Sequence, residues 1–166
     1  AAWRIWKGRM LLWHYRSRHE SLIAFSNARF YDGQLIITPS PFPKSPDLGI
    51  RYVPVPNGVF KDNRNHAEAD QVVQLVLDHV RRWPHRSLGV VTMNYHQQGL
   101  IDSALDRLRK SDVALLEFED RHAGDEPLFV KNLENAQGDE RDTIIISMTY
   151  GCGEDGKLRH QFGPIN

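Results

Sequence analysis

Apolar residues recur along this chain at two spacings, one typical of helices and the other of short strands. The clearest helical stretch follows Asn65, which forms a capping pair with Glu68, and it ends before Pro84. A similar pair, Asn94 and Gln97, predicts the start of a second helix. The apolar positions are Ala69, Val72, Val73, Val76, Leu77 and Val80 in the first helix, and Ile101, Ala104, Leu105 and Leu108 in the second.

A weaker helical pattern lies nearer the amino terminus. Ser17 and Glu20 have the spacing of a capping box, and the helix that they start should end near Arg29. The segment 120–126 is dense in charged residues, and we predict a loop there.

Short apolar runs predict the strands. The run at 143–148 is nearly continuous and rich in β-branched residues, as expected of a strand buried on both faces. Segment 50–55 also alternates, but Pro54 restricts it to an edge strand or an extended segment. The five predicted strands are 10–13, 35–37, 88–92, 128–130 and 143–148. Their alternation with helices predicts an α/β layer fold with a mostly parallel sheet.

Polar clusters directly follow several of these strands. They comprise His14–Arg16, Thr92–Asn94, the residues from Tyr150 onward, and the loop Glu134–Glu140. Ligands of parallel α/β sheets bind beyond the carboxyl ends of the strands. We therefore expect the clusters to converge at one edge of the sheet and to form a site. Gly138 would allow the backbone to turn sharply or to approach a ligand closely.

Composition narrows the class of protein. The 166 residues favour one domain, and 21 cationic side chains balance 21 anionic ones. A protein that coats DNA with positive charge is therefore excluded, although a local basic stripe could still bind nucleic acid. Cys152 is the single cysteine, so no intrachain disulfide can form, and the chain suits a reducing, cytoplasmic environment. No segment predicts a membrane span or a signal peptide. Both ends have the character of cuts from a longer protein.

Two short patterns have possible functional interpretations. Gly151–Gly156 matches G-x-G-x-x-G, but Glu154 and Asp155 would repel a pyrophosphate, and we predict a surface hairpin or loop. The same acidic loop could belong to a nuclease, yet it lacks a rigid strand beneath it. Arg16, beside other cations, suits phosphate binding, while a solvated arginine or a salt bridge is an equally open alternative.

Three segments together resemble the motifs of superfamily 1 helicases. Residues 13–27 with 30–35 resemble motif IV, residues 88–97 resemble the I-G-V-I-T-P-Y-x-x-Q segment, and residues 135–147 resemble motif V. They occur in the family's order over about residues 10–151. The most similar group contains the nonsense-mediated-decay RNA helicases and bacterial multidomain relatives. His14 and Met93 depart from the Gln and Pro usual at these positions.

The resemblance implies a RecA-like (P-loop NTPase-like) three-layer fold. Residues 1–166 would form a single partial domain, the second RecA-like domain of an ATP-dependent helicase or translocase, incomplete at the carboxyl terminus before motif VI. Its partners would be the first RecA-like domain of the same polypeptide, which carries the Walker motifs, and single-stranded DNA or RNA. ATP and Mg²⁺ would bind only in the full-length protein.

The resemblance also assigns roles to residues at the nucleotide. Arg16 would reach the γ-phosphate across the cleft between domains and act as the catalytic arginine finger. Glu140 would bind the ribose, Gly138 would permit a close backbone approach, and Gln137 would couple the nucleotide to the nucleic acid.

Further residues are implied on the nucleic-acid face, where Thr92 and Asn94 would contact a single strand. Two alternatives remain open. One is a catalytically silent α/β module that binds a partner, and the other is a domain associated with a nuclease.

Overall fold

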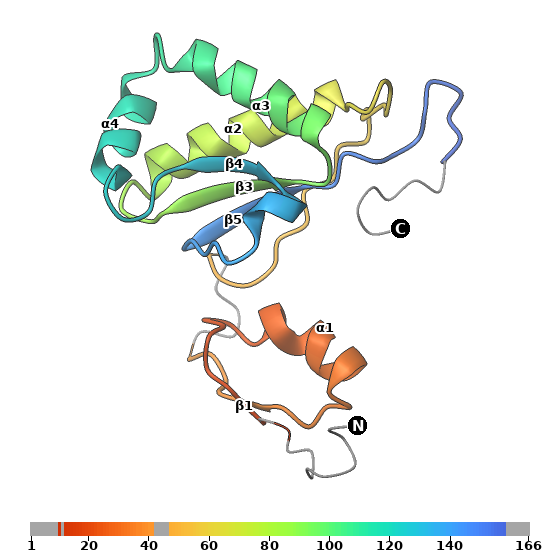
Figure 1. The fold of residues 1–166 in the computed structure, drawn as a ribbon, viewed down its shortest axis with the longest axis vertical. Helices are drawn as coiled ribbons and strands as arrows, with labels where there is room; N and C mark the ends of the chain where they lie inside the picture. Colours follow the sequence, from red (N-terminus) through yellow and green to blue (C-terminus); the bar gives the residue numbers. More distant parts are fainter. Residues whose placement is uncertain (1–9, 11, 42–46, 159–166) are drawn as a thin grey trace, which may run out of the picture. The chain divides into compact units, whose positions relative to one another are not determined.

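The computed structural model describes residues 10, 12–41 and 47–158. The chain divides into two compact units, Ala1–Pro54 and Val55–Asn166. In the first unit, strand β1 (Trp13–His14) leads into helix α1 (Ser21–Phe30) and then strand β2 (Ile36–Ile37). The two strands pair in parallel, with Trp13 opposite Ile36 (Figure 1). This unit is therefore a small β–α–β element with a sheet of its own.

The predicted capping box at the start of α1 is wrong. The helix begins at Ser21, and its N-cap residue, Glu20, makes no side-chain capping bond. Ser17 lies too far before Ser21 to cap the helix. Its side chain and amide instead contact His14: the Ser17 amide donates to Nε2 of His14 at 3.1 Å, and the Ser17 hydroxyl lies 2.7 Å from the same nitrogen. The Glu20 carboxylate instead accepts from the amide of Ser40 at 2.7 Å, and this hydrogen bond lowers the pKa of Glu20.

The second unit contains a three-stranded parallel sheet with helices on one side. Along the chain it consists of α2 (His66–Arg82), β3 (Leu88–Thr92), α3 (Tyr95–Leu108), α4 (Val113–His122), β4 (Phe129–Asn132), the 3-10 helix η2 (Leu133–Ala136) and β5 (Thr143–Ser147). The strand order is β4-β3-β5, and Val90 lies opposite Val130 and Ile145. The α2, α3 and α4 helices cover the same face of this sheet (Figure 1). The predicted α/β class with parallel strands is confirmed.

Helix α2 packs its apolar stripe against this face. Its buried apolar positions are the six predicted from their spacing, and Asn65 caps it by accepting from the amide of Glu68 at 3.1 Å. The core also takes side chains from β3, α3 and α4. Its fully buried members include Val76, Leu88, Val90, Ile101, Leu105 and Leu115.

Helix α4 was not predicted, and the predicted charged loop at 120–126 is wrong in its first half. The helix runs to His122, and Asp112 caps it by accepting from the amide of Leu115 at 3.1 Å. Only two of its residues, Leu115 and Phe118, are buried. One short apolar stripe among charged residues is a weak periodic signal, which explains why the helix was missed.

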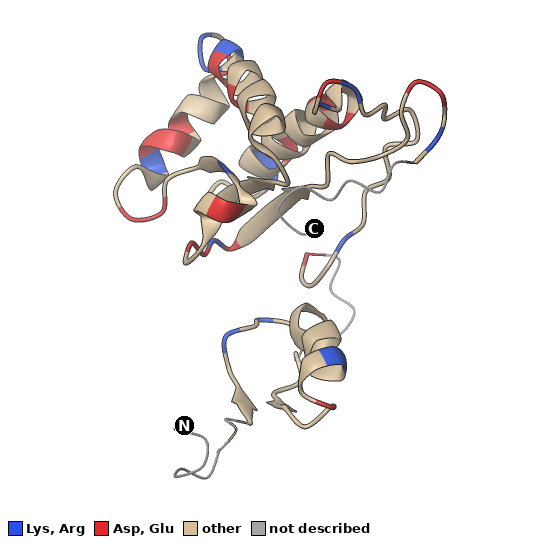
Figure 2. Ribbon diagram, turned by 45° about the vertical axis from the view of Figure 1, so that its right-hand side comes forward, with Lys and Arg blue, Asp and Glu red and all other residues tan. Residues whose placement is uncertain are grey.

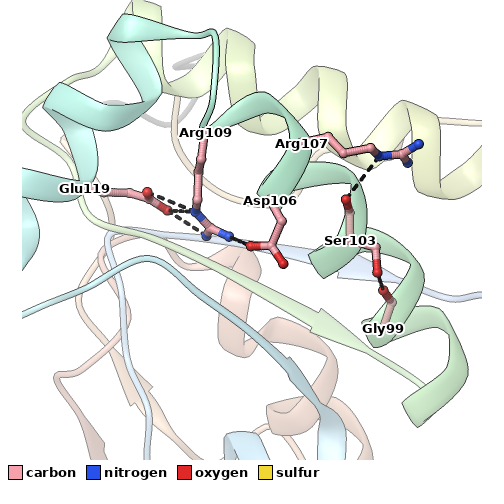
Figure 3. A network of polar contacts seen from close by, with 6 residues as sticks. All are labelled: Gly99, Ser103, Asp106, Arg107, Arg109 and Glu119. Carbon is pink, nitrogen blue, oxygen red and sulfur yellow. Dashed lines mark hydrogen bonds and ion pairs between the residues drawn. The ribbon is translucent and has the colours of Figure 1, made fainter.

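The turn between α3 and α4 is held by an arginine. Arg109 donates from Nε and Nη2 to Oε1 of Glu119 at 2.9 and 2.7 Å, and from Nη1 to Asp106 (Figure 3). These hydrogen bonds, that with Glu119 foremost, raise the pKa of Arg109. Two residues earlier, Arg107 donates from Nε to the Ser103 carbonyl at 3.1 Å. The paired guanidinium joins the end of α3 to the middle of α4.

Strand β5 is not buried on both faces as predicted. Among the described strands it contacts only β3 and forms an edge of the sheet. Ile144 and Ile146 are 39% and 57% exposed, while Ser147 on the other face is fully buried. The helices cover one face only, so alternate isoleucines lie outside the core.

The buried ring of His79 makes the stability of this unit sensitive to pH. The side chain is 2% exposed, Nε2 donates to the Arg86 carbonyl at 2.8 Å, and Nδ1 is buried without a hydrogen-bond partner among the described residues. Burial lowers the pKa of His79 below its ordinary 6.5. Stability is therefore complete above about pH 6.5 and falls as the pH drops through the lowered folded-state pKa.

We expect the free energy of unfolding to fall between pH 7.5 and pH 5.5 by up to about 1.4 kcal/mol per pH unit. Urea unfolding followed by circular dichroism would measure it. His79→Gln keeps a donor for the Arg86 carbonyl but cannot titrate, so its loss over the same range should be smaller. An equal loss in the variant and the wild type would exclude His79 as the source.

Candidate functional site

The polar segments of the second unit lie at two opposite ends of its sheet. Thr92 pairs with Asn132 and Ser147 at the carboxyl end, and Leu88 pairs with Thr143 at the amino end. The ends are about 13 Å apart, given the rise per residue of a strand. Arg141 and Asp142 directly precede β5, and their hydrogen bonds to Pro127 and Ser87 place them at the amino end.

The expectation that all polar clusters meet at one edge is therefore only partly right: Thr92–Asn94 and the exit of β5 do meet at the carboxyl end, where the Met93 amide donates to the Ser147 carbonyl, but the loop after β4 does not stay there. Strand β5 runs parallel to β4, so the chain must return from the carboxyl end of β4 to the amino end before β5 can begin. Segment 133–142 makes this return, with η2 at its start. The cluster that follows β1 belongs to a different, two-stranded sheet.

The return segment is anchored to the sheet at several points. Nζ of Lys131 donates to Asp139 at 2.7 Å. Arg141 donates from Nε and Nη2 to the Pro127 carbonyl at 3.2 and 2.9 Å, and its guanidinium lies 4.8 Å from the ring centroid of Phe129. These contacts fix the course of the loop along β4.

A reciprocal pair of hydrogen bonds fixes the end of the loop to the start of β3. Asp142 accepts from the amide of Ser87 at 3.0 Å, and the Asp142 amide donates to the Ser87 hydroxyl at 3.0 Å. Ser87 is fully buried, so this junction belongs to the rigid part of the unit.

The predicted nucleotide residues fall between these anchors. Gln137, Gly138 and Glu140 are all exposed, whereas Asp139 and Arg141 are half-buried and bonded to the sheet. Gly138 has φ of +89°, and among the described residues, its two chain neighbours apart, no heavy atom lies within 4 Å of the position that a Cβ would take. The loop therefore presents an open backbone surface flanked by an amide and a carboxylate on a fixed support.

At the carboxyl end, Thr92 does not face solvent. Its side chain is fully buried, and its hydroxyl donates to the Asn94 carbonyl at 2.8 Å. Asn94 caps α3 by accepting from the amide of Gln97 at 2.9 Å, and its Nδ2 is buried without a hydrogen-bond partner among the described residues. The next residue, Tyr95, is 70% exposed. Thr92 thus shapes the start of α3, while Asn94 and Tyr95 border the surface.

Sequence reasoning missed a buried polar network under this end. Both oxygens of the Glu68 carboxylate accept from the amide of Thr149, at 2.9 and 3.1 Å. The same carboxylate accepts from the Ser147 hydroxyl at 2.8 Å and from Nδ2 of Asn65 at 3.2 Å. Thr149 and Ser147 are fully buried. The start of α2 is thereby bonded to the exit of β5.

Gln97 extends the network to α3. Its side-chain oxygen accepts from the Asn65 amide at 2.9 Å, and its Nε2 donates to the Asn65 carbonyl at 3.0 Å. In a capping box, Glu68 would bond the Asn65 amide. Gln97 takes that position, which leaves the Glu68 carboxylate for Thr149. The two capping pairs were the available sequence signal, and only the fold shows that each reaches beyond its own helix.

Arg16 lies in the first unit, two residues after β1. It is exposed, and its neighbour Tyr15 is 83% exposed. The flanking turns are held locally: His14 bonds Ser17, and Nδ1 of His19 accepts from the amide of Ser21 at 3.2 Å. These contacts hold the backbone on both sides of Arg16.

The late glycine-rich segment is a hairpin. Cys152 and Leu158 form an antiparallel bridge, and the Gly153 amide donates to the Lys157 carbonyl at 3.1 Å. The prediction of a hairpin or loop in place of a dinucleotide-binding turn is confirmed. Within the described ranges no three His, Cys, Asp or Glu side chains gather as a metal site.

Surface charge is mixed in the part of the chain that the structure describes. Figure 2 shows acidic and basic residues interspersed over the helices and loops of the second unit. No helix within the described ranges has the length and apolar composition to cross a membrane.

Comparison with known proteins gives two kinds of match. A family model described as an AAA domain matches residues 4–158. The uncharacterized ATP-dependent helicase MG140 of Mycoplasma genitalium is 38% identical over 162 residues, which cover 95% of this chain and 14% of that protein. The homolog of MG140 in Mycoplasma pneumoniae is similar to the same extent. The chain thus spans 14% of the length of these curated relatives.

Proposed function

We propose, from the premise that the chain belongs to this family of AAA domains, that it is the second RecA-like domain of an ATP-dependent nucleic-acid helicase or translocase. The helicase-type character follows from the family and from its relatives. The observation that carries the finer proposal is the 137–142 loop. Asp139 is bonded to Lys131 of β4 and Arg141 to the Pro127 carbonyl just before β4, while Gln137, Gly138 and Glu140 are exposed.

This loop suits one wall of a nucleotide site. A carboxylate at Glu140 can accept hydrogen bonds from both ribose hydroxyls, and the open backbone at Gly138 allows close approach. In the proposed motor, Arg16 meets the γ-phosphate, and the first RecA-like domain holds Mg²⁺ and the phosphates. ATP bound between the two domains draws them together, and hydrolysis releases them.

The carboxyl end of the sheet suits contact with a single strand. Asn94 and the exposed Tyr95 lie at the exit of β3, the location where parallel sheets bind ligands. Binding of a single strand would combine stacking of a base on the exposed Tyr95 ring with polar contacts from Asn94. Direct binding by Asn94, with Thr92 beneath it, is part of the proposal.

Glu140→Ala tests the nucleotide wall. In the full-length protein we expect the KM for ATP to rise about tenfold with kcat nearly unchanged, because a hydrogen bond to a charged group is worth about 1.5–3 kcal/mol. The wild type should also discriminate against 2′-deoxy-ATP, and the variant should lose that discrimination. Steady-state ATPase assays measure both effects.

Glu134→Ala is the matched control, because Glu134 is an exposed carboxylate in η2, before the loop. It should leave both quantities unchanged. Unaltered KM and unaltered discrimination in Glu140→Ala would reject the ribose contact and favour the alternative of a silent partner-binding module.

A further inference from the structure

Thr149 has a backbone conformation that its side chain disfavours. Its φ is +65°, in the left-handed region, and its side chain is fully buried. A β-branched residue is a genuine outlier there and persists only where its surroundings fix it. Thr149 is the second residue after β5, so its φ sets the direction in which the chain leaves the sheet.

Glu68 supplies the contacts that fix Thr149. Its two carboxylate oxygens straddle the Thr149 amide, at 2.9 and 3.1 Å, and one of them also accepts from the Ser147 hydroxyl. Hydrogen bonds to an ionised carboxylate are stronger than neutral ones. Glu68 lies in the first turn of α2, where the helix dipole also favours negative charge.

The segment that Glu68 holds borders the proposed strand-binding surface. The Met93 amide donates to the Ser147 carbonyl at 3.2 Å, so the exits of β3 and β5 are joined just before Asn94 and Thr149. Beyond Thr149, the Tyr150 ring lies against Phe60, with centroids 5.1 Å apart. A change of Thr149 to negative φ would redirect the chain at Tyr150. It would thereby disturb the exit of β5, which the Met93–Ser147 hydrogen bond joins to the segment that leads into Asn94.

We infer that Glu68 is a positioning residue: it holds Thr149 in the left-handed conformation and thereby sets the carboxyl end of the sheet in the geometry that binds a single strand. The inference rests on the proposed function for the identity of the ligand. The hold on Thr149 does not depend on that ligand: it rests on the hydrogen bonds from the Thr149 amide to Glu68, beside a weaker one from Nδ2 of Asn65 to the Thr149 carbonyl at 3.4 Å.

The test uses the full-length protein and fluorescence anisotropy with labelled dT20 and U20 oligonucleotides. Glu68→Ala should weaken the affinity for the preferred oligonucleotide at least about tenfold, because it removes the carboxylate that accepts from the Thr149 amide and from the Ser147 hydroxyl. Glu68→Gln, which retains one acceptor oxygen, should lose less. The KM for ATP without nucleic acid should change less than twofold, because the side-chain contacts of Glu68 are with Asn65, Ser147 and Thr149, outside the 137–142 loop.

Rescue separates positioning from a general loss of stability. Glycine adopts positive φ without a steric penalty, so Thr149→Gly in the Glu68→Ala background should restore most of the lost affinity. Glu117→Ala, which changes an exposed carboxylate on α4, should behave as wild type. Unchanged affinity in Glu68→Ala, or no rescue by glycine, would overturn the inference.

Hydrogen exchange distinguishes failure of this inference from failure of the proposed function. If the wild-type protein binds neither oligonucleotide, the proposed function fails, and exchange at residues 148–150 still reports the hold on Thr149. Faster exchange in Glu68→Ala, reversed by Thr149→Gly, supports the positioning role. Exchange that is the same in the wild type and Glu68→Ala overturns it.

Discussion

Arg16→Ala is expected to lower the ATP turnover of the full-length protein by a factor of about 10³ or more, the range found for arginine fingers. The guanidinium compensates charge that develops on the transferred phosphoryl group, so its loss acts on the transition state more than on bound ATP. The affinity for a non-hydrolysable ATP analogue should therefore change little. Single-turnover hydrolysis and equilibrium nucleotide binding measure the two effects separately.

The chain offers a matched control for this experiment. Arg18 is also exposed and lies in the same segment, but the motif resemblance gives it no catalytic role. Arg18→Ala should keep most of the turnover. Arg16→Lys retains the charge but not the planar fork, so its turnover should stay well below wild type. Equal turnover in wild type and Arg16→Ala would reject the arginine-finger role.

Local periodicity predicted the parts of the fold that depend on local pattern. The α2 helix was evident because six apolar residues repeat at helical spacing over more than three turns, between a cap at Asn65 and Pro84. The β3 strand was evident because residues 88–92 form a short, nearly continuous apolar run, and all of them are buried in the structure. Both elements depend on residues that are near one another in the sequence.

Features that depend on the fold as a whole were not predictable. The Glu68 carboxylate bonds Thr149, 81 positions away, and nothing in the spacing of Asn65 and Glu68 indicates that partner. The return of segment 133–142 from the carboxyl end of β4 to the amino end of β5 follows from the parallel strand order β4-β3-β5, which no short motif specifies. The burial of Thr92 likewise depends on the network around it. Residue types for a site were thus recognisable, while their grouping into two ends was not.

Phe118→Ala is expected to lower the free energy of unfolding by about 3–5 kcal/mol, the cost of deleting a buried phenylalanine from a core. Phe118 is 1% exposed and belongs to the core cluster beneath α2 and α3. Its ring meets His79 edge-on with centroids 6.0 Å apart, and lies 4.5 Å from that of His122. The charged face of α4 and the Arg109–Glu119 contact would remain, so the loss reports the cavity.

Leu116→Ala separates this cavity effect from helix propensity. Leu116 lies on the same helix but is 43% exposed, so its truncation should cost less than about 1 kcal/mol. Urea unfolding at pH 7.5, with the helical circular-dichroism signal as the readout, gives both values under conditions where His79 is neutral. A loss for Phe118→Ala no larger than that for Leu116→Ala would show that α4 does not pack on the core. A large difference would establish that this short helix, which sequence periodicity does not reveal, supports the helical layer that includes α2, the helix on which Glu68 lies.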